Sequence, residues 1–146
     1  MTARRPIGDD GNALVEFTYL AVLLMVPLIY VLLAGFQVQR AAFGVTEAAR
    51  QAGRAYARAG STIEGQARAD AAAALALKDQ GISDSSPPVI TCLGGACLEP
   101  GSRVRVTVTY TVLLPVFPAV LGRGRAPAIP VTASHVEVVD EFGPGR

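Results

Sequence analysis

The chemistry that this sequence implies most clearly lies near its N-terminal end, at Gly11 and Glu16. Gly11 precedes Asn12, and a residue without a side chain lets a protease approach the backbone of the bond between them. Cleavage there would create a new amino group on Asn12. Glu16 follows five residues after the glycine, directly before an uncharged run of twenty residues that starts at Phe17. The spacing predicts a processing site at Gly11 and Asn12, followed by a carboxylate at the start of an apolar helix.

The position of Glu16 is energetically unfavourable unless the carboxylate finds a partner. An ionised side chain at the centre of a membrane helix costs about 2.5 to 3.5 kcal/mol on insertion scales, and less near the interface. Pairing with the free amino terminus of a neighbouring subunit would offset that cost and set an axial register. We therefore predict that Glu16, with Phe17 beside it, serves assembly and not catalysis. The alternative is that Glu16 only begins the helix, where an acid interacts favourably with the helix dipole.

Cys92 and Cys97 are the two cysteines of the chain, and Gly94-Gly95 lies between them. Such a pair can close a small disulfide loop, which is expected in a domain exported across a membrane. The loop-entropy relation gives so short a ring roughly 2 kcal/mol of stabilisation. A metal site is the competing interpretation, but zinc needs more ligands than two, and the single histidine lies about forty residues away. We predict a disulfide, no metal and no cofactor.

No group of residues predicts an active site. The chain has one histidine, no serine in a nucleophile-elbow context, no phosphate-binding loop and no cluster of carboxylates. His135 falls in an alternating segment, where an exposed strand residue is the simpler interpretation. The formal net charge of +1 gives no general attraction to nucleic acid. These features favour a structural or binding protein over an enzyme.

The uncharged run from Phe17 to Phe36 predicts a membrane helix, because about 20 apolar residues span the ~30 Å hydrocarbon core of a bilayer. The run is longer than the apolar region of a secretory signal peptide, and no convincing Ala-x-Ala step follows it. We therefore expect the helix to stay in the mature protein. Pro27 lies inside it, where a membrane helix tolerates a kink without breaking.

The helical pattern continues beyond this run to about Ala59. Small residues recur there at 4-3-4-3-4 spacing, which predicts a narrow packing stripe: Ala41, Val45, Ala48, Ala52, Ala55 and Ala59. Another face, which we expect to be solvated, carries three arginines at successive i,i+4 positions: Arg50, Arg54 and Arg58.

A second helix and a small sheet are predicted after Gly60. Ser61 or Thr62 can cap a helix that runs to about Gln80. Strands are predicted where β-branched residues alternate with polar ones, and a connection rich in proline and glycine separates the last two: Val89–Leu93, Arg103–Val112 and Val131 to about Val139. The predicted fold class is α+β: a long N-terminal transmembrane helix that continues outside the membrane, a second helix, and a small antiparallel β-sheet domain.

Together these motifs resemble the TadE-like family, the minor pseudopilins of tight-adherence (Tad/Flp) pilus machines. The glycine and the A-L-V-E-F block of residues 11–17 have the spacing of a type IV prepilin-like signal. Residues 48–55 are similar to the A-R-E/Q-G/A-A/G-R segment that family members carry just beyond the membrane. The resemblance is strong over residues 11–57 and only architectural beyond. The chain departs from the family at Gln37 and Gln39, where an acidic residue often occurs, and in the position of Pro27.

The resemblance implies that a prepilin peptidase cuts after Gly11 and that the protein then serves in pilus biogenesis. The implied partners are this peptidase, other pilins or pseudopilins, the inner-membrane assembly platform and the lipid bilayer, but no nucleic acid. The alternative function is a single-pass, membrane-anchored extracytoplasmic binding module that does not enter a filament.

The orientation in the membrane requires a choice between two signals. More arginines follow the apolar run than precede it, so the positive-inside rule alone would place the C-terminal part in the cytoplasm. A prepilin-like signal instead requires a cytoplasmic leader, and the cysteine pair favours an oxidising compartment. We expect a leader at residues 1–11, a transmembrane and extended helix at 12–59, and an extracytoplasmic α+β domain at 60–146.

Overall fold

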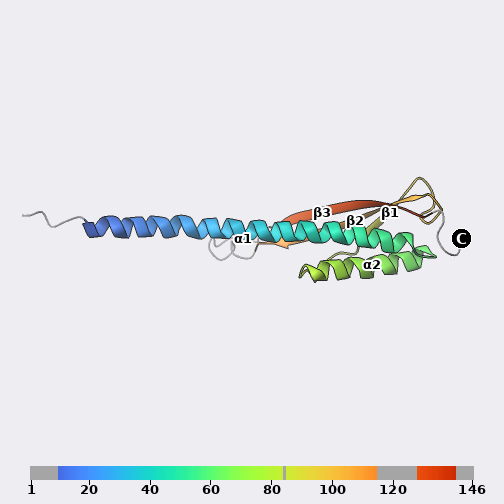
Figure 1. Cartoon of the computed structure of the whole chain (residues 1–146), viewed down its shortest axis with the longest axis horizontal. Helices are drawn as coiled ribbons and strands as arrows, with labels where there is room; N and C mark the ends of the chain where they lie inside the picture. Colours follow the sequence, from blue (N-terminus) through green and yellow to red (C-terminus); the bar gives the residue numbers. More distant parts are fainter. Residues whose placement is uncertain (1–9, 84, 115–127, 141–146) are drawn as a thin grey trace, which may run out of the picture. The chain divides into compact units, whose positions relative to one another are not determined.

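Two helices followed by three strands make up the described chain (Figure 1). This computed structural model describes residues 10–83, 85–114 and 128–140, with side chains from Ala13 onward. Most of the predicted leader, the proline-rich connection at 115–127 and the C-terminal tail lie outside the described residues. The elements are α1 (Asp10–Ala57), α2 (Thr62–Asp79), β1 (Val89–Leu93), β2 (Arg103–Leu113) and β3 (Ala128–Val138). The predicted α+β class and the order of its elements are confirmed.

The chain divides into two compact units, which meet between Phe36 and Gln37. The boundary lies inside α1. The second unit therefore contains the last part of α1 together with α2 and the sheet. This division follows from packing, because the residues of α1 beyond Gln37 have partners elsewhere in the chain.

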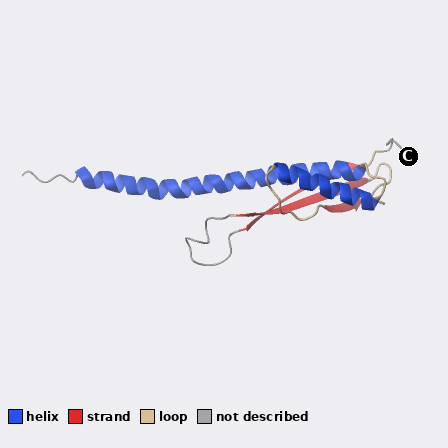
Figure 2. Cartoon of the chain, turned by 90° about the horizontal axis from the view of Figure 1, so that it is seen from below, coloured by secondary structure: helices blue, strands red, loops and turns tan. Residues whose placement is uncertain are grey.

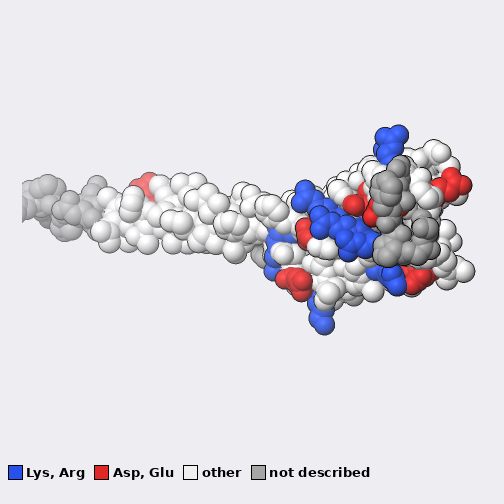
Figure 3. Space-filling model, turned by 45° about the vertical axis from the view of Figure 1, so that its right-hand side comes forward, with Lys and Arg blue, Asp and Glu red and all other residues white. Residues whose placement is uncertain are grey.

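The first unit is an apolar stretch of α1 whose large side chains are exposed. The helix continues through Pro27 without interruption. It is long and apolar enough to cross a membrane. Between Ala13 and Phe36 this unit carries a single charged residue, Glu16, and Figure 3 shows charged side chains gathered on the second unit instead. The hydroxyl of Thr18 donates to the Leu14 carbonyl oxygen at 2.8 Å, so this polar group is satisfied within the helix.

The second unit is a two-layer arrangement in which α1 and α2 lie on one face of a three-stranded antiparallel sheet (Figures 1 and 2). The strand order is β1-β2-β3. On central strand β2 the burial alternates as the sequence predicts, since successive side chains of a strand point to opposite faces. The valines on the face toward the helices are buried, whereas arginines and threonines on the other face are exposed or half-buried.

Small side chains on α1 allow this close packing. Of the predicted stripe, Ala55 is half-buried and the other five residues are buried. Two residues outside the stripe, Ala49 and Tyr56, are buried as well. The buried surface of α1 is wider than predicted because it serves two neighbours: α2, through alanines and Leu77, and the sheet, through the β2 valines. The arginines at 50, 54 and 58 are exposed, as predicted.

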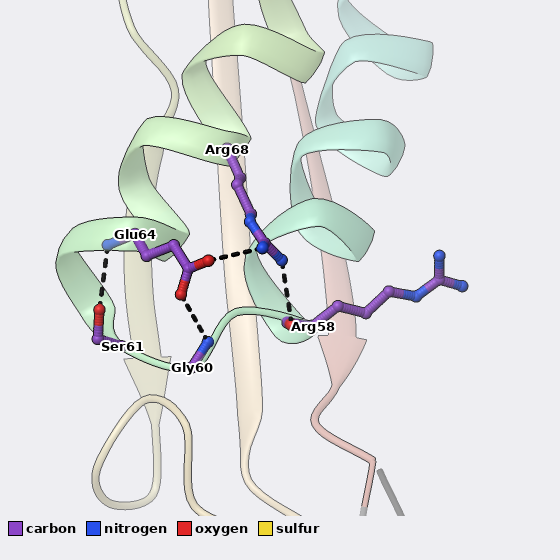
Figure 4. Close-up of polar contacts among 5 residues, drawn as sticks. All are labelled: Arg58, Gly60, Ser61, Glu64 and Arg68. Carbon is purple, nitrogen blue, oxygen red and sulfur yellow. Dashed lines mark hydrogen bonds and ion pairs between the residues drawn. The ribbon is translucent and has the colours of Figure 1, made fainter. Parts of the chain in front are cut away.

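The turn between the helices is held by side-chain contacts at the start of α2 (Figure 4). The Ser61 hydroxyl accepts from the Glu64 backbone N–H at 3.3 Å, which identifies Ser61 as the N-cap. The Glu64 carboxylate accepts from the Gly60 N–H at 3.1 Å and forms an ion pair of 2.6 Å with Arg68. Arg68 also donates to the Arg58 carbonyl oxygen at 3.4 Å. These contacts fix the direction of α2 relative to the end of α1.

Candidate functional site

The predicted processing site lies in the first turn of α1. The helix begins at Asp10, so the bond between Gly11 and Asn12 is part of its N-terminal end. The first four N–H groups of an α-helix have no partner within the helix. A glycine in a helix is also less favourable than alanine by about 1 kcal/mol. Both effects make the turn around Gly11 easier to unwind than the turns that follow.

Glu16 lies one turn after Asn12 on the same helix, among exposed apolar side chains. Four-residue spacing puts Asn12 and Glu16 on the same side of α1. Glu16 is exposed, and Phe17 beside it is 73% exposed. No hydrogen bond or ion pair joins Glu16 to any residue that the structure describes. The carboxylate is therefore available to a cationic group outside the described chain.

Cys92 and Cys97 are joined by a disulfide, with their Cα atoms 4.8 Å apart. The bond closes the loop that follows β1. Gly94 has a φ of 90°, a conformation that glycine adopts without strain, so the Gly-Gly sequence allows the tight turn. The Ser102 hydroxyl donates to the Cys97 carbonyl oxygen at 3.1 Å and ties the loop to the start of β2. The disulfide therefore has a structural role at this end of the sheet.

The prediction that His135 is an exposed strand residue is wrong. His135 is half-buried on the helix-facing side of β3, where its Nε2 lies 3.1 Å from Oε2 of Glu137. A Cβ atom built on Gly53 of α1 would lie 3.5 Å from Cδ2 of His135. The helix approaches the strand closely enough to cover part of the imidazole. The alternation of Val131, Ala133 and His135 along one face could have revealed this orientation.

Within the described ranges, the His135–Glu137 pair is not part of a larger cluster of metal-binding side chains. Among the described residues, no group of three or more His, Cys, Asp or Glu side chains could hold a metal ion. Burial raises the pKa of one group in the second unit, Tyr56, above its ordinary value of 10.0, because the phenolate would lose its hydration there. Tyr56 belongs to the packing between α1 and α2, so this shift reflects the core and not a catalytic site.

Comparison with known proteins gives no match: no family model, no curated protein sequence and no solved structure corresponds to this chain. The resemblance to the TadE-like family thus rests on the motifs of residues 11–57. The structure shows which surfaces surround those motifs. Between Ala13 and Phe36 the first unit presents an apolar surface with one acid near its start, whereas the second unit has a buried core of its own.

Proposed function

We propose that this protein is a minor pseudopilin or pilus-assembly component of a Tad/Flp-type system. In this proposal it is cleaved after Gly11 and assembles through its N-terminal apolar helix. The observation that carries the proposal is the contrast along α1, where large apolar side chains are exposed up to Phe36 and Glu16 has no partner among the described residues. Such a surface needs lipid or other helices to cover it, and such an acid needs a cation.

Cleavage would supply that cation. A prepilin peptidase that unwinds the first turn of α1 at Gly11 would leave a free amine on Asn12. This amine is one helical turn from Glu16 in the same chain, and in a filament the amine of a neighbouring subunit could occupy the same position. Two unit charges about 4 Å apart attract each other by roughly 1 to 4 kcal/mol, depending on how much water remains. The attraction favours one axial register between subunits.

The partners that follow are the peptidase, other pilins or pseudopilins, and the inner-membrane assembly platform. The leader faces the cytoplasm and the second unit lies outside it, where the Cys92–Cys97 disulfide would persist. A phosphatase that is active only outside the cytoplasm, fused after Gly143, tests this orientation. An active fusion is expected. An inactive fusion, together with an active cytoplasmic reporter at the same position, would contradict it.

The second candidate function is a membrane-anchored extracytoplasmic binding module. It is favoured by the second unit, which has a core of its own and the disulfide, and would fold in the same way without a filament. In that case the first unit would serve only as an anchor, and Glu16 would have no role in assembly.

Substitution of Glu16 separates the two candidates. Glu16→Ala and Glu16→Gln should still be cleaved but should enter filaments about five-fold less or worse, because the lost ion pair contributes roughly 1 to 4 kcal/mol. The measurement is the amount of this protein in sheared pili relative to the membrane fraction. The matched control is Glu47→Gln, which changes an exposed acid on the same helix within the second unit. Normal incorporation of both Glu16 variants would favour the binding module.

A further inference from the structure

A small hollow lies at the end of the second unit where the chain leaves the apolar run. It has a volume of about 110 Å³ and is lined by Gln37 and Arg40 from α1 and by Tyr110 and Leu113 from β2. Buried Ile82 and Val112 form part of its apolar wall. The hollow therefore combines one cation, two hydrogen-bonding side chains and an apolar surface.

Arg40 is the cation of this hollow, and none of the described residues pairs with it as an anion. Its side chain is exposed and makes no hydrogen bond or ion pair with the residues described in the structure. Arg68, by contrast, is paired with Glu64 and with a backbone carbonyl. A guanidinium group offers several N–H donors in a planar arrangement that matches the oxygens of a phosphate.

The position of Arg40 along α1 places it at the level of lipid headgroups. The uncharged run from Phe17 to Phe36 is about 30 Å long at 1.5 Å per residue, which matches the hydrocarbon core of a bilayer. Arg40 follows Phe36 by four residues, or about 6 Å along the helix axis. The headgroup layer on each side of the core is about 5 to 7 Å thick. Leu113, which also lines the hollow, is 64% exposed and so presents an apolar side chain beside the arginine.

We propose that this hollow binds the phosphate of an anionic phospholipid headgroup. Arg40 pairs with the phosphate, Gln37 and Tyr110 supply hydrogen bonds, and Leu113 lies at the boundary of the acyl chains. The proposal rests on α1 crossing a membrane, which is part of the proposed function, but it does not depend on pilus assembly. The lipid would hold the start of the second unit at the membrane surface.

The chain has no tryptophan, so a single introduced tryptophan can report the distance to lipid. Three full-length variants are reconstituted separately in phosphatidylcholine vesicles that contain some phosphatidylglycerol. Leu113→Trp reports the hollow, and Leu28→Trp reports insertion of the apolar run. Val138→Trp is the distal control, because Val138 pairs with Arg103, ten residues and about 33 Å along β2 from Leu113. Quenching is measured with nitroxide lipids labelled close to the headgroup, with the label on either phosphatidylglycerol or phosphatidylcholine. For Leu28→Trp, which lies about 12 Å inside the hydrocarbon core, lipids labelled near the end of the acyl chain are used instead.

The expected result is quenching of Leu28→Trp and Leu113→Trp but not of Val138→Trp. For Leu113→Trp, labelled phosphatidylglycerol should quench about five-fold more effectively than labelled phosphatidylcholine, the preference expected for one basic residue near an anionic surface. Adding Arg40→Gln should remove this preference, whereas Arg40→Lys should retain part of it. Arg50→Gln, which changes an exposed arginine further along α1, should leave it intact. Circular dichroism checks that each variant is folded.

Three results would overturn the proposal. The first is quenching of Leu28→Trp without quenching of Leu113→Trp, which would leave the membrane span standing and exclude the headgroup contact. The second is an equal effect of the two labelled lipids on Leu113→Trp, or a preference that Arg40→Gln does not change. The third is loss of the preference when inorganic phosphate is added at constant ionic strength, which would identify a site for free phosphate. Absence of quenching in all three reporter variants would instead contradict the membrane span itself, and with it the proposed function.

Discussion

The two units of this chain differ in whether the apolar side chains of α1 are exposed or buried. In the first unit, leucines, valines and phenylalanines of α1 are exposed, whereas in the second unit the alanines of the same helix are almost fully buried. The change occurs within one continuous helix, between Phe36 and Ala41. The same helix therefore forms both where its side chains are exposed and where they are buried. The second unit finds its packing partners within the chain, whereas the first must find them in lipid or in other proteins.

The largest expected effect comes from truncating one leucine in each unit. Leu77 is 1% exposed and lies in the core of the second unit, whereas Leu24 is 68% exposed in the first. Leu77→Ala should lower the free energy of unfolding by about 2 to 5 kcal/mol, because it removes buried methyl groups and leaves a cavity. Leu24→Ala should change it by less than about 0.5 kcal/mol. The measurement is urea unfolding of the full chain in detergent micelles, followed by tyrosine fluorescence.

Equal effects of these two variants would contradict the difference in burial between the two units. A large loss in Leu24→Ala would mean that the first unit shares the core of the second. A negligible loss in Leu77→Ala would mean that the alanine-rich interface contributes little stability.

A smaller effect is expected from two glycines that lie in the packed helices. A Cβ atom on Gly65 of α2 would lie 2.9 Å from Cδ2 and Cε2 of Tyr56, too close without movement of the buried ring. Gly65→Ala should therefore destabilise the second unit by about 1 to 3 kcal/mol despite the better helix propensity of alanine.

Gly53→Ala is the matched control, because its Cβ would make ordinary contacts at 3.5 Å with His135 and Glu137. It should be neutral or stabilising by up to about 1 kcal/mol. The same unfolding measurement applies to both variants. If Gly53→Ala were the more damaging of the two, the helix would lie closer to β3 than the structure shows.

The smallest effect concerns the pH dependence of stability through Tyr56. This side chain is 3% exposed, and burial raises its pKa above the ordinary value of 10.0. Above about pH 10, the unfolded state therefore loses the phenol proton while the folded state retains it. The resulting contribution to stability is fully present below that pH and is lost as the pH rises through the folded-state pKa. Tyr56→Phe should flatten the fall in melting temperature between neutral and strongly alkaline pH; an unchanged slope would contradict burial of the phenol.

Much of the fold could be predicted from local sequence patterns. The strict alternation from Val104 to Val112 identifies both faces of β2, because only one side of the sheet is covered. Ser61 followed by Glu64 identifies the start of α2. The end of α1 is predicted to within two residues, and such a difference is within the usual variation of helix boundaries.

Other features could not be predicted because they depend on the tertiary arrangement. The burial of Ala49 and Tyr56 follows from contacts of α1 with α2 and with the sheet, on two sides of the helix. The start of β3 at Ala128 includes Pro130, which is tolerated because β3 has a paired neighbour on one side only among the described strands. At the candidate site, the exposure of Glu16 follows from the apolar run around it. Its pairing with the amine of a neighbouring subunit stays a prediction, because no described residue makes a hydrogen bond or ion pair with its carboxylate.

The proposed function depends most on cleavage between Gly11 and Asn12, which would create an amine that can pair with Glu16. The most direct test is intact-mass spectrometry of the protein isolated from membranes of cells that produce a prepilin peptidase active on a known pilin. The expected result is a mature chain that begins at Asn12, and a Gly11→Leu variant that stays uncut. A wild-type chain that retains residues 1–11 while the control pilin is fully processed would contradict it.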